Sequence, residues 1–240
     1  MHDEVECFFQ AKFLPAIVQF CGSVKDKRDW VKAVSIEPMP GGRGVHIIAS
    51  NTKCIVVIQD LMGYAVAPML LNFNSAFVAE VKKLVKADHQ VGKICVNQDT
   101  SWGVDGNNEV HCRNMVTRFN SKTAPWRSMV ASVMNAPQGI AESIAGFDFE
   151  GIKRFSEMVD LTSPYAAPHH ISVTPRGGGF VVRSASLSDA FGVIVGVQHP
   201  ALPSDLPDWG EVAIGARAPQ PIAQRPPAAI SSTGASVHEA

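Results

Sequence analysis

The chain repeats one pattern three times: a strand, then a helix, then three strands. Alternating apolar residues predict the strands, and apolar residues at helical spacing predict the helices between them. In the first copy the predicted segments are a strand at 5–10, a helix at 12–21 and strands at 31–37, 45–49 and 54–59. A unit of this kind must bury its apolar face against its neighbours. The repeat therefore predicts an α+β protein with helices on one face of antiparallel sheets.

The second and third copies follow the same order. In the second, Asn74 is placed to cap a helix in which Phe77 and Val81 recur at i and i+4. In the third, Asp148 is placed to cap a helix that carries Phe155 on its apolar face. The remaining predicted strands are 65–71, 93–97, 101–104 and 109–114 in the second copy and 140–147, 170–174, 179–184 and 190–197 in the third.

These copies give the predicted division of the chain. Residues 1–130 form one complete domain of two halves, 1–66 and 67–130, and residues 131–198 form a third half-domain. From 199 to 240 the sequence is rich in proline, alanine and serine and poor in large apolar side chains. We therefore expect a disordered tail there.

The composition excludes several classes of protein. A net charge of -1 over 240 residues is not that of a protein that holds nucleic acid by bulk charge, so any DNA contact must come from a local patch. The five cysteines show no metal-binding spacing and are expected to be buried thiols in a reducing cytosol. The acidic start of the chain does not resemble a secretion signal, and no apolar run reaches the ~18 to 20 residues that span a membrane. We therefore expect a cytoplasmic protein with no membrane contact.

The sequence motifs of enzymes are missing as well. The glycine-rich segments 41–44 and 177–179 precede predicted strands and not helices, which predicts hairpin turns in place of phosphate-binding loops. The adjacent His169 and His170 would point to opposite faces of a strand, and no carboxylate or cysteine lies at local ligand spacing. The sequence therefore predicts no catalytic residue, no metal site and no cofactor.

Three separated stretches share an order and spacing with a known pocket. They are Ala49-Ser50-Asn51-Thr52-Lys53-Cys54-Ile55, Pro125-Trp126-Arg127-Ser128-Met129-Val130 and Phe191-Gly192-Val193-Ile194-Val195-Gly196-Val197. This set resembles the partner-binding pocket of bacterial DNA sliding clamps, the beta subunits of DNA polymerase III, whose segments read A-T-D-G-x-x-L, F-P-D-Y-R-R-V and V-x-M-P. The chain departs from that pattern at Asn51, Thr52, Cys54 and Gly196, but its segments keep their apolar character.

The resemblance implies an apolar cleft that binds short linear peptides of partner proteins. The residues that would form it are Ser50, Thr52, Ile55, Pro125, Met129, Val193 and Val195, with Ser50 and Thr52 at its polar edge. On burial statistics alone, Ile55, Val193 and Val195 would instead be ordinary core residues of strands.

The resemblance also implies a DNA-clamp fold, in which βαβββ half-domains form a ring and the helices line a hole around duplex DNA. The cations expected to face the DNA phosphates are Lys82, Lys83 and Lys86 on the second helix and Lys153 and Arg154 on the third, with Lys12, Lys25, Lys27 and Arg28 as weaker candidates. The other interpretation is that these cations form a solvated helix face, which is common opposite an apolar stripe.

The function implied is that of a processivity factor, which is not an enzyme and tethers a DNA polymerase or other replication proteins to duplex DNA without regard to sequence. Three half-domains per chain would need four chains for a ring of twelve, so we expect a tetrameric homo-oligomer. The alternative is a clamp-like interaction module, a decoy or regulator of replication that does not encircle DNA, and the missing half-domains favour it. The unusual domain count favours a phage or plasmid origin.

Overall fold

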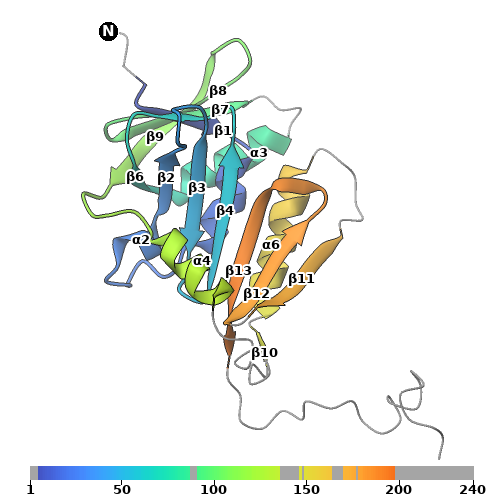
Figure 1. Ribbon diagram of the computed structural model, residues 1–240. Helices are drawn as coiled ribbons and strands as arrows, with labels where there is room; N and C mark the ends of the chain where they lie inside the picture. Colours follow the sequence, from blue (N-terminus) through green and yellow to red (C-terminus); the bar gives the residue numbers. More distant parts are fainter. Residues whose placement is uncertain are drawn as a thin grey trace, which may run out of the picture. The chain divides into compact units, whose positions relative to one another are not determined.

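The computed structural model describes residues 5–86, 91–135, 146–147, 149–163, 170–176 and 178–197 (Figure 1). All of them belong to one compact unit, Met1–Ala201. The predicted tail at 199–240 lies outside the described residues, as do Asp148, His169, Gly177 and most of the predicted strand at 140–147.

The first copy contains one helical turn that the sequence pattern did not predict. Its elements are β1 (Cys7–Gln10), α1 (Phe13–Ile17), the 3-10 helix η1 (Val18–Phe20), α2 (Asp29–Lys32), β2 (Val34–Pro38), β3 (Val45–Ser50), β4 (Cys54–Asp60) and β5 (Tyr64–Ala65). The predicted strand at 31–37 is wrong at its start, because α2 includes Val31 and Lys32. The Lys32 ammonium lies 2.7 Å from the Asp29 carboxylate, and the Val31 carbonyl accepts a hydrogen bond from the Gly22 N–H. These contacts stabilise the turn.

The second copy confirms the predicted helix and divides one predicted strand. Its elements are β6 (Met69–Phe73), α3 (Ser75–Lys86), β7 (Lys93–Asn97), β8 (Thr100–Val104) and β9 (Val110–Arg118). The Asn74 Oδ1 atom caps α3 by accepting a hydrogen bond of 2.8 Å from the Ala76 N–H. The predicted strand at 65–71 is wrong as a single element, since Ala65 ends β5 and Met69 begins β6. Pro68 lies between them and has no N–H to donate to a sheet.

The third copy follows a connecting helix, α4 (Trp126–Met134), which the repeat did not predict. Its elements are β10 (Gly146–Phe147), α6 (Phe149–Thr162), β11 (Ile171–Arg176), β12 (Gly179–Ser184) and β13 (Leu187–Val197). Phe155 is buried on the sheet side of α6, as predicted. Among the described helices, none combines the length and the apolar character that a membrane crossing requires.

Within the part of the chain that the structure describes, every strand pairing is antiparallel, and thirteen strands form one sheet. The order is β11-β12-β13-β4-β3-β2-β6-β9-β8-β7-β1-β5, and β10 pairs with β13. The predicted α+β class is confirmed. The order also places the third copy beside the first, because β13 pairs with β4.

The first and second copies exchange their first strands. β1 of the first copy pairs with β7 of the second, and β6 of the second pairs with β2 of the first. The buried carboxylate of Asp60 joins β4 to β1, since it accepts hydrogen bonds from the backbone N–H of Gln10 at 2.7 Å and from its side chain at 2.8 Å. The two copies are therefore interlocked around a shared core.

Helices cover both faces of the sheet where the first and third copies meet. α1 packs against both α3 and α6 on one face, and α4 lies on the other (Figure 1). Alternate residues of β4 show the division: Val56 and Ile58 belong to the core under α1 and α6, whereas Ile55 and Val57 belong to the core under α4. The predicted arrangement, with helices on one face, therefore does not hold for α4, and Trp30 of α2 packs into the same cluster as α4.

Candidate functional site

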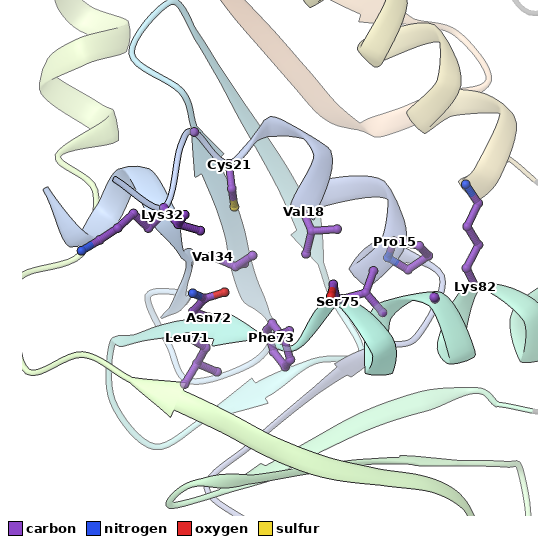
Figure 2. A pocket seen from close by; sticks show the side chains of 14 residues that line it. Pro15, Val18, Cys21, Lys32, Val34, Leu71, Asn72, Phe73, Ser75 and Lys82 are labelled. Atoms are coloured by element: carbon purple, nitrogen blue, oxygen red, sulfur yellow. The ribbon is translucent and has the colours of Figure 1, made fainter. Parts of the chain in front are cut away.

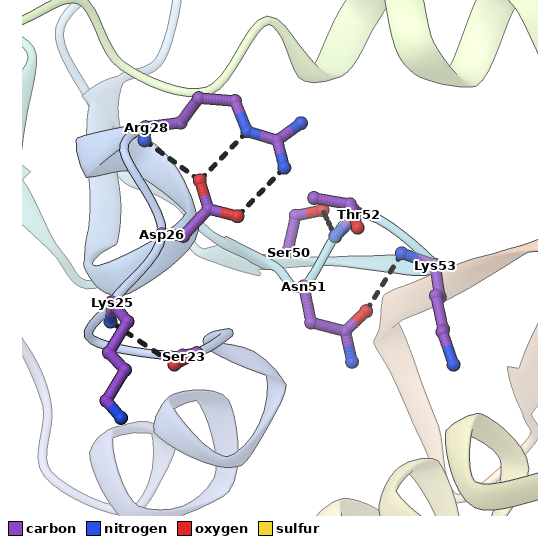
Figure 3. A network of polar contacts seen from close by, with 8 residues as sticks. All are labelled: Ser23, Lys25, Asp26, Arg28, Ser50, Asn51, Thr52 and Lys53. Carbon is purple, nitrogen blue, oxygen red and sulfur yellow. Dashed lines mark hydrogen bonds and ion pairs between the residues drawn. The ribbon is translucent and has the colours of Figure 1, made fainter.

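The predicted cleft residues come from the β3–β4 turn, from β4 and β13, and from the start of α4. At the turn, the Ser50 hydroxyl donates a hydrogen bond to the Cys54 carbonyl at 2.9 Å and accepts one from the Thr52 N–H at 3.2 Å (Figure 3). Ser50 is fully buried, so its hydroxyl shapes the turn.

Thr52 adopts a backbone conformation that favours glycine. Its φ is 75°, in the left-handed region, and Thr52 stands where the sliding-clamp pattern has glycine. The Asn51 side chain supports the turn, because its Oδ1 atom accepts hydrogen bonds from the N–H groups of Lys53 and Cys54 at 3.1 and 2.9 Å. The turn geometry is thus consistent with the proposed alignment of this segment.

The strand residues of the predicted cleft lie under α4. Ile55 and Val193 face each other across the β4–β13 pairing, and both are buried. α4 covers them with the buried Val133 and the half-buried Met129 and Trp126. The structure therefore brings Ile55, Met129 and Val193 together in one packed cluster.

Pro125 and Val195 lie at the margin of this cluster. Pro125 directly precedes α4 and is exposed. Val195 lies on the same side of β13 as Val193, because side chains alternate along a strand, and it is 42% exposed. Its N–H donates a hydrogen bond of 2.8 Å to the Lys53 carbonyl, which fixes this end of β13 to the β3–β4 turn. We call Pro125, Met129 and Val195 the α4 rim.

The carboxylate of Glu37 in β2 holds the start of α4. It accepts hydrogen bonds from the Thr123 hydroxyl at 2.8 Å, the Trp126 indole N–H at 3.1 Å and the Arg127 guanidinium at 2.7 Å. Burial by itself raises the pKa of Glu37, but the three donors outweigh it and hold the pKa below its ordinary value. Glu37 is therefore an anionic anchor for α4.

Two hollows reach Trp126 on this face. The larger, about 580 Å³, is lined by Glu37, Pro68 and residues 121–128. The smaller, about 150 Å³, is lined by His46, Val57, Gln59, Trp126, Ser188, Asp189 and Phe191. Burial, followed by the charge of Arg127, lowers the pKa of His46, although Glu37 opposes the shift. The His46 Nδ1 atom is buried without a hydrogen-bond partner among the described residues.

Sequence reasoning did not find Glu37 or His46. Glu37 and Arg127 are 90 positions apart, and no local pattern relates them. The helix that carries Trp126 did leave a signal, because apolar residues recur at i, i+3, i+4 and i+7 from Trp126 to Val133.

The predicted DNA-facing residues lie on the opposite face of the sheet. Lys82, Lys83 and Lys86 are exposed on α3, as is Lys153 on α6. The acidic residues of these helices are Glu80 on α3 and Glu150, Glu157 and Asp160 on α6. α3 is therefore the more basic of the two helices.

Arg154 is engaged within the protein. Its guanidinium donates a hydrogen bond of 3.0 Å to the Gln19 carbonyl and lies 3.3 Å from the Glu150 carboxylate. The Gln19 side chain donates in return to the Arg154 carbonyl at 3.2 Å. These contacts join α6 to η1.

Two of the weaker candidates also have internal contacts. The Arg28 guanidinium lies 2.9 Å from Asp26, and hydrogen bonds from Arg28 lower the pKa of Asp26 to about 2 (Figure 3). The Lys12 ammonium lies 5.0 Å from the centre of the Phe13 ring. Lys25 and Lys27 are exposed.

Lys82 also lines a pocket between α1, η1 and α3 (Figure 2). The pocket is about 440 Å³, and its walls are mainly apolar, with Lys32 and Lys82 as its two cations. Lys32 is paired with Asp29, so Lys82 is the cation of this pocket that the helix face presents to solvent.

A cluster of possible metal ligands lies on the β8–β9 hairpin. Atoms of Asp105, Glu109 and His111 lie within 4.8 Å of one another. Asp105 already accepts hydrogen bonds from the N–H groups of Asn107 and Glu109 and lies 3.2 Å from His111. These contacts account for the cluster as part of the hairpin turn.

Comparison with known proteins identifies the fold. No protein-family model and no curated protein matches the chain. Among solved structures, it is similar to the DNA polymerase sliding clamp of Pseudomonas aeruginosa, with 8% identity, a TM-score of 0.52 and coverage of 80% of this chain and 65% of that one. The DNA polymerase III beta subunit of Thermotoga maritima gives 12% identity, a TM-score of 0.50 and coverage of 86% and 67%. The sliding clamp of Bartonella birtlesii bound to griselimycin gives 10% identity, a TM-score of 0.50 and coverage of 83% of this chain and 68% of that one.

The chain therefore has the fold of the DNA polymerase III beta sliding clamps. It spans 65% of the length of the Pseudomonas clamp, about two thirds. At this level of identity the similarity concerns the fold and does not by itself transfer partners or activity.

Proposed function

We propose that this protein is a clamp-like processivity factor that encircles or contacts duplex DNA and tethers a DNA polymerase or other replication proteins to it. The observation that carries the proposal is the sliding-clamp fold with the lysine-bearing α3 on the same face as α1 and α6. Lys82, Lys83, Lys86 and Lys153 would face the phosphates there, and Arg154 would support α6. In this function the protein binds and positions its partners and performs no chemical step.

We propose that partner peptides bind along the α4 rim, where Pro125, Met129 and Val195 are accessible. Ile55 and Val193 would form the apolar floor beneath, and Ser50 and Thr52 would shape the turn at its edge. The hollow lined by His46, Trp126 and Phe191 would accept a side chain of the peptide. Griselimycin, which is bound in the Bartonella clamp structure, is a suitable first probe.

The DNA proposal is tested by replacing Lys82, Lys83 and Lys86 together with glutamate. We expect duplex binding to weaken and the slope of log K against log salt to fall by about 0.9 for each phosphate that the lysines no longer neutralise. The measurement is fluorescence anisotropy with a labelled duplex over a salt series. The matched control replaces three exposed cations away from α1, α3 and α6, namely Arg43, Lys93 and Lys122. Unchanged affinity and slope in the α3 variant would remove these lysines from the DNA interface.

A second candidate function is a clamp-like interaction module, a decoy or regulator that takes up clamp-binding peptides without encircling DNA. The observation that favours it is that α6 carries three acidic residues and that Arg154, one of its two cations, is engaged within the protein. Retention on nicked circular DNA, followed by release when the circle is cut, supports encirclement. Peptide binding with no retention on circular DNA supports the interaction module.

A further inference from the structure

The first and second copies form a pair in which the first strand of each pairs with the second strand of the other. The third copy has the structure of one half of such a pair. In the pair formed by the first two copies, β2 has a neighbour on each side, β3 and β6. The corresponding strand of the third copy, β11, pairs with β12 alone among the described residues. One edge of β11 is therefore open where the equivalent edge of β2 is filled.

The sequences of the two strands support this equivalence. β2 reads Val-Ser-Ile-Glu-Pro from Val34 to Pro38, and β11 reads Ile-Ser-Val-Thr-Pro from Ile171 to Pro175. Val34, Ser35 and Ile36 pair with β6, whereas Pro38 lies beyond that register. By correspondence, residues 171–173 form the part of β11 able to accept a partner strand, and Pro175 lies outside it.

The first strand of the third copy, β10, corresponds in the same way to β6. β6 pairs with the end of β9, and β10 pairs with the end of β13. The other side of β6 pairs with β2, whereas β10 has β13 as its one strand partner within the described residues. The third copy thus presents both a first strand and a second strand with open edges.

One flank of α6 is also suited to contact. Arg154 marks the flank that faces η1. At 100° per residue, Phe149, Ile152 and Ser156 lie on the opposite flank, and Phe149 is 70% exposed. The charged Lys153, Glu157 and Asp160 lie between the flanks, toward solvent. The flank of α6 that faces away from η1 therefore carries an exposed phenyl ring.

We propose that the third copy docks with the third copy of a second chain about a twofold axis. The first strand of each would pair with the second strand of the other, as β1 pairs with β7 and β6 with β2 within one chain. A second copy is the fitting occupant because both halves of the exchange lie on the same surface, which makes that surface self-complementary. The open part of β11, Ile-Ser-Val, carries none of the charges that protect sheet edges. This docking goes beyond the proposed function, since it would hold whether or not the assembly encloses DNA.

The test is the mass of the full chain by light scattering over a concentration series, for the native protein and two variants. Phe149→Glu places a charge on the α6 flank, and Val173→Pro removes an N–H that faces the open edge of β11. The control, Met62→Glu, alters a residue of the first copy that is also 70% exposed.

We expect the native mass to be at least twice 25.8 kDa. Each variant should halve the mass or raise the dissociation constant about tenfold or more, and the control should leave it unchanged. Far-UV circular dichroism establishes that the variants are folded, and Phe149→Glu in particular alters an exposed side chain. A native protein that stays monomeric, or an oligomer that persists unchanged in folded Phe149→Glu, would overturn the proposal. DNA binding is measured separately, so loss of the oligomer and loss of DNA affinity are distinguishable.

Discussion

The carboxylate of Glu37 links two parts of the chain that are far apart in sequence. Its three donors come from the segment that leads into α4, whereas Glu37 itself lies on β2. A buried carboxylate keeps its charge only when hydrogen-bond donors compensate for the hydration that burial removes. The three donors therefore keep Glu37 ionised, and the ionised carboxylate in turn holds the donors in place. Glu37 therefore helps to position α4 over β4 and β13, together with the apolar cluster beneath the helix and the hydrogen bond from the Ala124 N–H to the Ser35 hydroxyl.

Replacing Glu37 with glutamine tests this dependence through pH. The folded pKa of Glu37 lies below its ordinary value, so the folded state binds fewer protons than the unfolded state. The resulting stability is present above the unfolded pKa of about 4.3 and is lost as pH falls through the folded value. We expect Glu37→Gln to be less stable at neutral pH by about 1 to 3 kcal/mol and to lose less stability than the native protein on acidification.

Urea unfolding at a series of pH values from about 6 to about 3 measures both effects. Glu157→Gln, on the exposed face of α6, is the matched control. An identical pH dependence in the native protein and in Glu37→Gln would show that this carboxylate does not anchor α4.

Individual elements differ in how far local sequence determines them. α3 could be predicted because its cap, Asn74, and its apolar spacing are both local. α2 could not, since its single turn is supported by the contact between Val31 and Gly22. The candidate site follows the same rule. The three motif segments could be read from the sequence, but their cover by α4 depends on contacts between residues about 90 positions apart, such as that of Arg127 with Glu37.

Replacing Val195 with lysine tests whether the α4 rim is the peptide site. Val195 is partly exposed, so the charge should be tolerated in the folded protein, but a bound apolar peptide would bury it without a partner. We expect affinity for griselimycin to fall about tenfold or more, measured by isothermal titration calorimetry. Val66→Lys, at another exposed valine, should bind as the native protein does. Equal affinity in the two variants would place the peptide elsewhere.

At the scale of the whole molecule, β13 and β9 are the last strands of the third and second copies. Along one edge of each strand, two segments have different surroundings. Along one side of β13, residues 190–194 pair with β4 and residues 196–197 pair with β10. Along the corresponding side of β9, residues 116–118 pair with β6, and within the described residues β6 does not extend beside Val110 or Met115. Each chain thus has a second open edge in addition to that of the third copy. If both edges close on other copies, alternating contacts between like edges join four chains into a ring of twelve half-domains.

This assembly predicts the effect of charging the open part of β9. Val110 and Met115 are exposed there, and lysine at both positions should oppose strand addition while leaving the core of the chain intact. We expect the double variant to have about half the native mass by light scattering and to lose retention on nicked circular DNA. Its affinity for a short linear duplex should be retained, because the α3 lysines are untouched. The matched control places lysine at Leu61 and Met62, which are similarly exposed but lie in the first copy. A variant that keeps both its mass and its retention on circles would show that the β9 edge does not close the ring, whereas one that loses mass but still remains on circles would show that encirclement does not explain retention.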